Sequence, residues 1–310
     1  MPDIISVAHL SKTFKDIIAV DDLSFSVPQG EVYGFLGQNG AGKSTTIRML
    51  LTLVEPTDGQ IRIFDLDLKK HRKEILKRVG AIVEKPDVYR YLSGLENLRL
   101  FAAMSGVKVS DRQLMDQLEK VGLAGRAKSK VKTYSQGMRQ RLGIAIALAN
   151  DPELIILDEP MNGLDPQGIA DIRNLIIHLG RDMKKTLVVS SHLLGEMELI
   201  ADSLLIIDKG KKVVEGTMTD LFDPAEKMVE LQTNNVAETY EKLRRANLAY
   251  IFSIRGDHIL FRVRHDEVPS LIRQLVRMDI DIISLFSKHS LENYFLSLTT
   301  DTQHVDSFKD

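Results

Sequence analysis

The feature that most constrains the fold is a glycine-rich segment, GQNGAGKS, at residues 37–44. It fits the pattern G-x-x-x-x-G-K-[ST] and lies between an apolar run, VYGFL, and a stretch with helical periodicity, TTIRMLLTL. In this context of strand, loop and helix, the pattern is typical of a loop whose consecutive backbone N–H groups converge on a phosphate. The sequence therefore predicts an α/β domain that binds phosphate. The alternative, a glycine-rich turn with a chance lysine, does not account for these flanking segments.

Side chains in this loop and in a second segment suit phosphate and metal chemistry. Lys43 can reach the β- and γ-phosphate oxygens of a nucleotide, and Ser44 can offer its hydroxyl to Mg²⁺. In LIILDEP, Asp158 follows four apolar residues and can hold Mg²⁺, while Glu159 can polarise a water aimed at the γ-phosphate. The alternative, two acids exposed at a surface strand end, is disfavoured by the apolar run before them.

Strand and helix patterns alternate along residues 1–222, where we expect the first domain. The runs LIILDEP, TLVVSSH and SLLIIDKG are continuous and apolar, as expected of buried parallel strands. His192 ends the second run; a lone histidine is more often structural than catalytic, so its role depends on its neighbours. Between about 86 and 148 helical periodicity replaces the strand signal, which predicts a helical insert.

The pattern changes again after about residue 222. Strands and helices then follow the order βαββαβ, with a hairpin around Gly256 and a final helix in LENYFLSL, residues 291–298. This order matches the ferredoxin-like arrangement. We expect a small C-terminal α+β domain over residues 226–300, followed by a tail, 301–310.

Composition excludes several classes of protein. The 310 residues are 44% hydrophobic and 27% charged, which is ordinary for a globular chain with a proper core. The net charge of −2 provides no basic surplus for nucleic acid, and the absence of cysteine excludes disulfides and thiolate metal sites. We find no signal-peptide pattern and no apolar run near the ~18–20 residues that span a bilayer. We therefore expect a chain that is soluble when isolated and has any membrane role through a partner.

Taken together, the motifs resemble those of the ATP-binding cassette (ABC) ATPases, in the family's order, over residues 4 to about 220. GQNGAGKST looks like the Walker A loop, YSQGMRQR like the signature motif and LIILDEP like Walker B; NGLDP looks like the D-loop and SSHLLGEME like the H-switch. The signature segment makes the resemblance specific, because Walker A also occurs in kinases and GTPases. The resemblance implies an ATPase with ATP and Mg²⁺ as its ligands.

The resemblance also assigns roles to single residues. It implies catalytic roles for Lys43, Glu159 and His192, and Mg²⁺ contacts for Ser44, Glu84 and Asp158. Phe14 stands where the family places an adenine-stacking aromatic side chain. The implied nucleotide contacts are Phe14, Gly37, Gln38, Asn39, Gly40, Ala41, Gly42, Lys43, Ser44, Thr45, Ser135, Gly137 and Asp165.

A second helix start in the sequence also favours an anion. Ser135, Gln136 and Gly137 place a hydroxyl and bare backbone at the N-terminus of a helical segment, where free N–H groups and the helix dipole attract negative charge. In the ABC family this start contacts the γ-phosphate held by a second ATPase domain, paired head to tail. The resemblance therefore implies a nucleotide-dependent dimer, expected to be a homodimer, with two composite sites.

Two positions depart from the family pattern. The usual signature of the family is Leu-Ser-Gly-Gly-Gln, whereas Tyr134 to Met138 of this sequence read YSQGM. Glu84 stands where the family has the glutamine of the Q-loop. Both departures, and the C-terminal SLENYFLSLT, resemble the bacitracin- and lantibiotic-type exporters, whose ATPase and permease are separate chains. The resemblance implies an exporter subunit for peptide antibiotics or drugs, with a role in antibiotic resistance. It implies binding to a membrane permease at the cytoplasmic face of the cell membrane, and no nucleic-acid partner.

Two other functions stay open at this point. A non-transport ABC ATPase of DNA repair or translation usually carries a long coiled-coil insertion or two cassettes, and this sequence has neither. A nucleotide-gated binding module without turnover is disfavoured, because Lys43, Asp158, Glu159 and His192 are all present. No residue of the sequence identifies the transported molecule.

Overall fold

The computed structural model describes residues 2–106, 109–221, 226–246, 248 and 250–288. By its internal contacts the chain forms two compact units, Met1–Thr217 and Met218–Asp310. The expected domain boundary near 222–225, the expected final helix at 291–298 and the expected tail lie outside the described residues.

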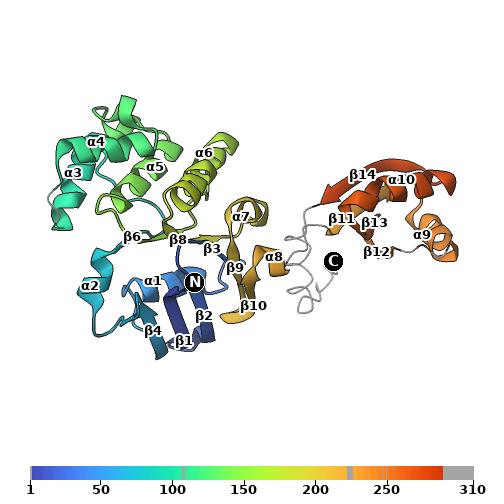
Figure 1. Ribbon diagram of the computed structural model, residues 1–310, viewed down its shortest axis with the longest axis horizontal. Coiled ribbons are helices and arrows are strands. Elements are labelled where there is room, and N and C mark those ends of the chain that lie inside the picture. Colours follow the sequence, from blue (N-terminus) through green and yellow to red (C-terminus); the bar gives the residue numbers. More distant parts are fainter. Residues whose placement is uncertain (1, 107–108, 222–225, 247, 249, 289–310) are drawn as a thin grey trace, which may run out of the picture. The chain divides into compact units, whose positions relative to one another are not determined.

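A mixed six-stranded sheet, in the order β10-β9-β3-β8-β7-β6, organises the first unit (Figure 1). All neighbouring pairs are parallel except β9 and β10. Every residue of β3, β7 and β8 is buried, which explains why their sequences are apolar without alternation. The strands are β3 (Val32–Leu36), β6 (Val79–Ile82), β7 (Leu154–Asp158), β8 (Thr186–Ser191), β9 (Ser203–Asp208) and β10 (Lys211–Thr217).

A helix follows each of the three central strands β3, β7 and β8, so the carboxyl ends of these strands meet at one edge of the sheet. These helices are α1 (Lys43–Leu50), α6 (Pro166–Ile177) and α7 (Leu194–Ile200); α6 continues as a π-helical turn, η3 (His178–Asp182), and α2 (Arg72–Lys77) precedes β6. Strands β7, β8 and β9 confirm the predicted buried parallel strands.

A second, antiparallel sheet in the order β2-β1-β4-β5 belongs to the same unit. Side chains of both sheets join one buried cluster with Ile47 and Leu50 of α1, and the rings of Phe25 and Phe35 lie 5.8 Å apart. The strands are β1 (Asp3–Phe14), β2 (Ile17–Pro28), β4 (Asp58–Ile63) and β5 (Leu66–Asp67). The sequence patterns indicated β1 and β2 but not β4, β5, β6 or β10.

The helical insert lies between β6 and β7 in the chain and forms the green helices of Figure 1. Capping boxes at Ser93 and Ser110 set the starts of its first two helices, because each serine hydroxyl accepts a backbone N–H bond in the first turn. The helices are α3 (Gly94–Met104), α4 (Asp111–Lys120) and α5 (Gln136–Ala147), with short 3-10 turns η1 (Ala124–Arg126) and η2 (Val131–Thr133).

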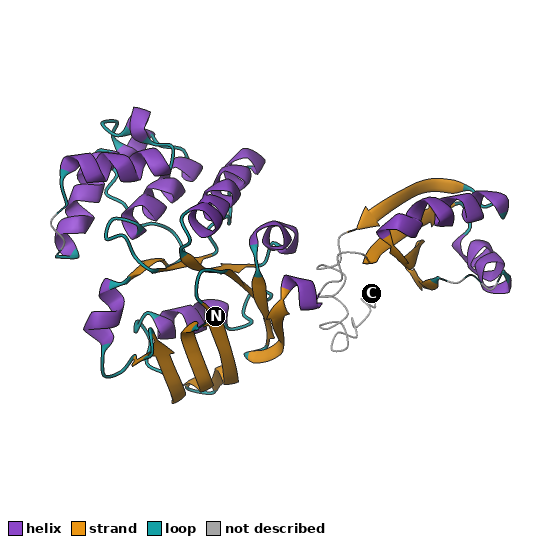
Figure 2. Ribbon diagram, viewed as in Figure 1, coloured by secondary structure: helices purple, strands orange, loops and turns teal. Residues whose placement is uncertain are grey.

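The second unit, drawn orange to red in Figure 1, has an antiparallel sheet in the order β12-β13-β11-β14. Figure 2 shows its two longer helices beside this sheet, and their Leu243, Leu271 and Leu275 pack with Val229 and Phe261 of the strands. Element order and strand order confirm the ferredoxin-like arrangement. The elements are α8 (Met218–Leu221), β11 (Glu226–Thr233), α9 (Val236–Arg245), β12 (Ile251–Arg255), β13 (His258–Arg264), η4 (His265–Glu267), α10 (Val268–Arg277) and β14 (Ile282–Lys288).

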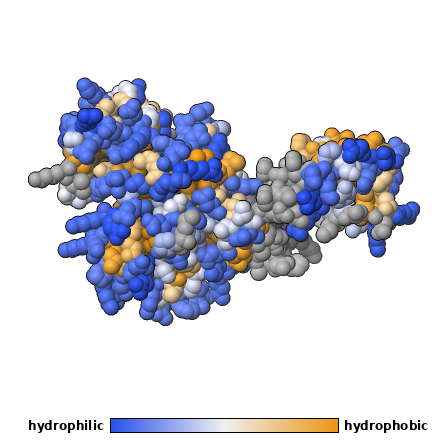
Figure 3. Space-filling model, in the orientation of Figure 1, coloured by the Kyte–Doolittle hydropathy of each residue, from blue (hydrophilic) through white to orange (hydrophobic). Residues whose placement is uncertain are grey.

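The surface of the first unit is mostly hydrophilic on the face that Figure 3 shows. Among the described residues, no helix combines the length and the apolar character needed to cross a membrane.

Candidate functional site

Four neighbouring strands of the six-stranded sheet each deliver a candidate residue at the carboxyl end. The glycine-rich loop follows β3, His192 follows β8, Asp158 ends β7, and the segment containing Glu84 follows β6. Ligands of open α/β sheets bind at this edge of the strands. The fold therefore brings together side chains that lie more than a hundred residues apart in the sequence.

Glycines shape the loop between β3 and α1. Gly42 precedes α1 with φ 107°, and a Cβ there would lie 2.6 Å from the carbonyl oxygen of Ala19. A Cβ at Gly37 would lie 2.6 Å from the carbonyl oxygen of Ile207. Gly42 therefore has both a dihedral and a steric reason to be glycine, and Gly37 a steric one. Gln38, Asn39 and Gly40 form the exposed part of the loop, whereas Ala41 is buried.

Lys43 is the first residue of α1 and is only 5% exposed. Its Nζ donates to the carbonyl oxygens of Gly37, at 2.6 Å, and Gln38, at 3.2 Å. The same atom lies 3.3 Å from Oε1 of Glu159. The ammonium is thus held inside the loop at the N-terminus of α1, where the helix dipole and free N–H groups also favour an anion. Thr45 is half-buried in the same first turn.

Asp158 is buried at the end of β7 and ties two elements of the site together. Its Oδ1 accepts hydrogen bonds from Ser44 Oγ, at 3.2 Å, and from Ser190 Oγ, at 2.6 Å. The Ser190 oxygen in turn accepts the backbone N–H of Glu159 at 2.9 Å. Ser190 is not among the site residues predicted from the sequence, although it begins the segment SSHLLGEME, which was the signal available for it.

Glu159 lies between a cation and a histidine. Its Oε2 is 2.8 Å from Nδ1 of His192, and its Oε1 faces Lys43. The backbone of Glu159 adopts φ 50°, in the left-handed region that non-glycine residues rarely occupy. Such conformations cluster at functional sites, where the surrounding structure maintains them. A carboxylate held in this way can accept a proton from a water molecule beside the phosphate site.

The donors around Ser44 and Asp158 fit a magnesium ion. Oδ2 of Asp158 is buried and has no hydrogen-bond partner, which is unfavourable for a carboxylate oxygen unless a cation meets it. Mg²⁺ usually takes one or two carboxylates from the protein, with substrate phosphates and water as its other ligands. Within the described part of the chain, no cluster of three or more His, Asp or Glu side chains offers a metal site of another kind.

Glu84 lies in the same cleft but does not bond to Ser44 or Asp158. Its carboxylate pairs with Nη2 of Arg48 on α1, and its side chain is 63% exposed. Like Glu159, it has a left-handed backbone, with φ 60°. The structure thus places Glu84 near the expected metal position, with an arginine as its partner.

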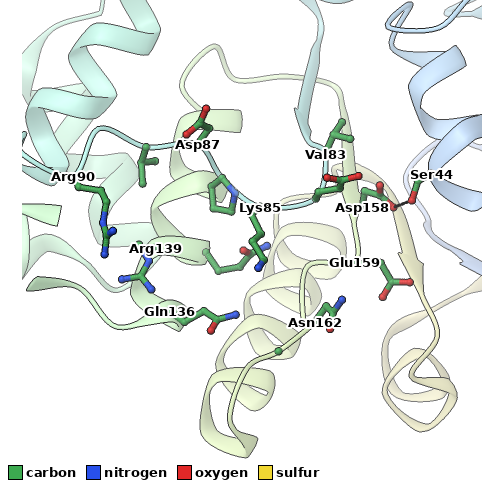
Figure 4. Close-up of a pocket in the computed structure, with 15 residues that line it drawn as sticks. Ser44, Val83, Lys85, Asp87, Arg90, Gln136, Arg139, Asp158, Glu159 and Asn162 are labelled. Carbon is green, nitrogen blue, oxygen red and sulfur yellow. Dashed lines mark hydrogen bonds between the residues drawn. The ribbon is translucent and has the colours of Figure 1, made fainter. Parts of the chain in front are cut away.

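The cleft itself, of about 990 Å³, extends from the phosphate edge to the helical insert (Figure 4). The side chains of Ser44, Asp158 and Glu159 lie at one end, and Gln136 and Arg139 of α5 lie at the other. Three cationic side chains line the cleft, and none of them is among the site residues predicted from the sequence: Lys85, Arg90 and Arg139. Arg139 sits inside the signature segment, which was the signal available for it.

Ser135 is the N-cap of α5, and its hydroxyl accepts the backbone N–H of Met138 at 3.2 Å. The preceding Tyr134 is buried and donates its hydroxyl to the carbonyl oxygen of Arg126 at 2.6 Å. Burial raises the pKa of Tyr134, so the phenol stays protonated. Gly137 follows in the first turn, where a Cβ would meet only Gly168, at 3.8 Å.

Two further predicted residues are not among those that line the cleft. Asp165 is the N-cap of α6 and accepts the backbone N–H of Gly168 at 3.0 Å, so its carboxylate has a structural partner. Phe14, at the end of β1, is 44% exposed, and Nζ of Lys12 lies 4.8 Å from its ring centroid. Phe14 is not among the residues that line the cleft.

Comparison with known proteins agrees with this geometry. Residues 20–162 match a family model described as ABC transporter. The chain is 41% identical to the bacitracin transport ATP-binding protein BcrA of Bacillus licheniformis over 300 residues, 96% of this chain and 98% of that protein. It is 39% identical to the lantibiotic transport ATP-binding protein SrtF of Streptococcus pyogenes over 240 residues, 77% of this chain and 100% of that protein. A solved ATP-binding subunit of an ABC transporter is similar with TM-score 0.62 and 32% identity, over 70% of this chain and 91% of that one.

Proposed function

The chain belongs to the ATP-binding cassette transporter ATPases, and from that premise we propose that it is the ATP-hydrolysing subunit of a peptide-antibiotic exporter. Membership makes it an ATP-binding subunit of a transporter with ATPase activity. The export of peptide antibiotics is supported by one observation above the others. The similarity to a bacitracin transport protein covers 96% of this chain, and so includes residues of the ferredoxin-like unit as well as the ATPase unit.

We propose that Ser44 and Asp158 hold Mg²⁺ together with the phosphates of ATP. The ion would neutralise charge that develops on the phosphate oxygens during hydrolysis. Lys43 would bind the β- and γ-phosphates, and Glu159 would accept the proton of the attacking water. His192, 2.8 Å from Glu159, would orient that carboxylate.

Members of this family work as dimers together with membrane permeases. We propose that two copies of this chain pair head to tail, with Ser135 and Gly137 of each facing the γ-phosphate held by the other. This assignment is supported by the exposure of Ser135 and by its place at a helix N-terminus. Phe14 would stack on the adenine, and Asp165 would lie near the dimer contact.

The proposed docking surface for the permease is the segment between Glu84 and α3. Tyr91 is 81% exposed there and Tyr89 is 52% exposed. The ring centroids of Tyr89 and Phe101 lie 6.1 Å apart. Exposed aromatic side chains of this kind favour contact with another protein. Through this contact the chain would be held at the cytoplasmic face of the membrane.

The test is reconstitution with the membrane protein that co-purifies with the tagged chain from detergent-solubilised membranes. We expect a permease with about six spans. Inside-out vesicles that contain the complex should accumulate bacitracin when ATP is supplied. Glu159→Gln should retain the complex and lose transport, whereas Tyr91→Asp should lose the complex and keep basal ATPase activity. Transport only of cargo other than peptide antibiotics would refute the proposed substrate class, and the absence of any membrane partner would refute the exporter proposal.

A further inference from the structure

The ion pair between Arg48 and Glu84 is not explained by the roles assigned so far. Glu84 stands where the family has a glutamine that approaches the metal, yet its carboxylate is bonded to the Arg48 guanidinium. Both side chains reach solvent, with exposed fractions of 37% for Arg48 and 63% for Glu84. Such an exposed pair adds little to folding stability, so stability alone is a weak reason for it.

The position of Arg48 on α1 relates the ion pair to the proposed metal site. Arg48 follows Ser44 by four residues, so the two side chains lie on the same face of the helix, one turn and about 6 Å apart along its axis. Ser44 bonds Asp158, and these two residues line the cleft together with Glu84. The carboxylate of Glu84 is therefore bonded to a residue that lies one helical turn after Ser44, whose hydroxyl is proposed to bind Mg²⁺.

A carboxylate in this cleft has two competing cations. It can pair with the guanidinium of Arg48, or it can move toward Ser44 and become a second carboxylate ligand beside Asp158. A glutamine at this position would not be held by Arg48 in the same way, because a hydrogen bond from a guanidinium to a neutral amide is weaker than one to an ionised carboxylate. The backbone of Glu84 is left-handed, with φ 60°, a region that non-glycine residues occupy mainly at functional sites.

We propose that Arg48 is a positioning residue that competes with Mg²⁺ for Glu84. Arg48 binds the carboxylate of Glu84, and Glu84 would leave the arginine to become a second carboxylate ligand when Mg²⁺ binds with ATP. Because Glu84 begins the segment that carries Tyr89 and Tyr91, this transfer couples metal binding to the proposed docking surface. The inference rests on the proposed function, in which Ser44 and Asp158 hold the metal.

The experiment is a double-mutant cycle of wild type, Arg48→Gln, Glu84→Gln and the double variant. The probe is Mn²⁺ added with adenylyl imidodiphosphate, which is not hydrolysed, and free Mn²⁺ is measured by electron paramagnetic resonance. We expect Arg48→Gln to lower the half-saturating Mn²⁺ concentration by about two- to five-fold, the range of an exposed ion pair. In the Glu84→Gln background the same change should have less effect. The difference between the effects of Arg48→Gln in the wild-type and Glu84→Gln backgrounds should become smaller at high salt, which screens exposed charges.

Arg72→Gln is the matched control, since it removes an exposed arginine that bonds Thr52 and does not line the cleft. It should leave Mn²⁺ binding unchanged. Competition is overturned if Arg48→Gln raises the half-saturating concentration, or if its effect is the same with and without Glu84.

Failure of the proposed metal site looks different in this assay. If Ser44→Ala and Asp158→Asn bind Mn²⁺ as wild type does, the metal site is wrong and the competition falls with it. If Ser44→Ala and Asp158→Asn lose Mn²⁺ binding while the effects of Arg48→Gln and Glu84→Gln simply add in the double variant, the metal site stands. Only the role of Arg48 is then refuted.

Discussion

The N-termini of α1 and α5 are both suited to an anion, and they are built differently. The first begins at a left-handed glycine without a side-chain cap, and its Lys43 is buried beside Glu159. The second begins at Ser135, whose hydroxyl is exposed and caps its own helix. The first has a cation, a proposed base and a proposed metal carboxylate from the same chain, whereas the second offers a hydroxyl and backbone N–H groups. This difference is the one expected if, as proposed, the second is half of a site that another chain completes.

The largest expected effect tests the completeness of the first site. Glu159→Gln removes the proposed base but keeps the shape of the side chain, so hydrolysis should slow by about 10²–10⁴ while ATP binding persists. The trapped ATP should then hold two chains together. Gel filtration with Mg²⁺ and ATP measures the dimer, and a monomer with wild-type turnover would contradict the assignment of Glu159.

The second expected effect tests whether α5 serves another chain. Ser135→Arg places a bulky side chain at the start of α5, and turnover should fall by at least about 10², as when a transition-state donor is removed. ATP binding by the isolated chain should stay unchanged, because its own loop is intact. Mixing this variant with Lys43→Ala should return part of the activity, since each mixed dimer keeps one intact composite site. If ATP binding by the isolated Ser135→Arg chain fell as well, α5 would belong to the same site as α1.

A smaller effect is expected on ATP affinity when Lys43, the cation of the first helix start, is removed. Lys43→Ala removes a charge-assisted phosphate contact worth about 1.5–3 kcal/mol, so ATP affinity should fall roughly 10- to 100-fold. Titration with a fluorescent ATP analogue measures it. Lys85→Ala removes a lysine that lines the cleft outside the glycine-rich loop, and should change affinity by less than about three-fold. Equal losses in the two variants would mean that only the general charge of the cleft matters.

The smallest expected effect concerns the support of the second helix start. Tyr134→Phe leaves the carbonyl of Arg126 without its donor and should lower the free energy of unfolding by about 1 kcal/mol. The raised pKa of Tyr134 means that this contribution is complete below about pH 10 and is lost as pH rises through the folded-state value. Urea unfolding at several pH values up to about 9 should therefore give a constant difference in the free energy of unfolding between wild type and Tyr134→Phe. A difference that varies over this range would show that the phenol titrates earlier.

Much of the first unit could be predicted, because its central strands are buried on both faces and read as continuous apolar runs. The missed strands have weaker signals: β6 has four residues, and β10, KKVVEGT, is an edge strand with charged side chains. The contacts of Lys43, Ser44, Asp158, Glu159 and His192 lie within motifs that the sequence displays. The pairing of Glu84 with Arg48 could not be predicted, because it depends on where the end of β6 lies relative to α1.

The left-handed backbone of Glu159 bears on how this chain evolves. A non-glycine residue in that region costs about 1–2 kcal/mol, and glycine would relieve the cost. Under selection for folding alone, glycine would therefore be favoured at position 159, and the glutamate persists only where selection on turnover opposes that drift. A programme that screens variants for heat resistance without an activity assay would thus tend to discard the proposed catalytic base.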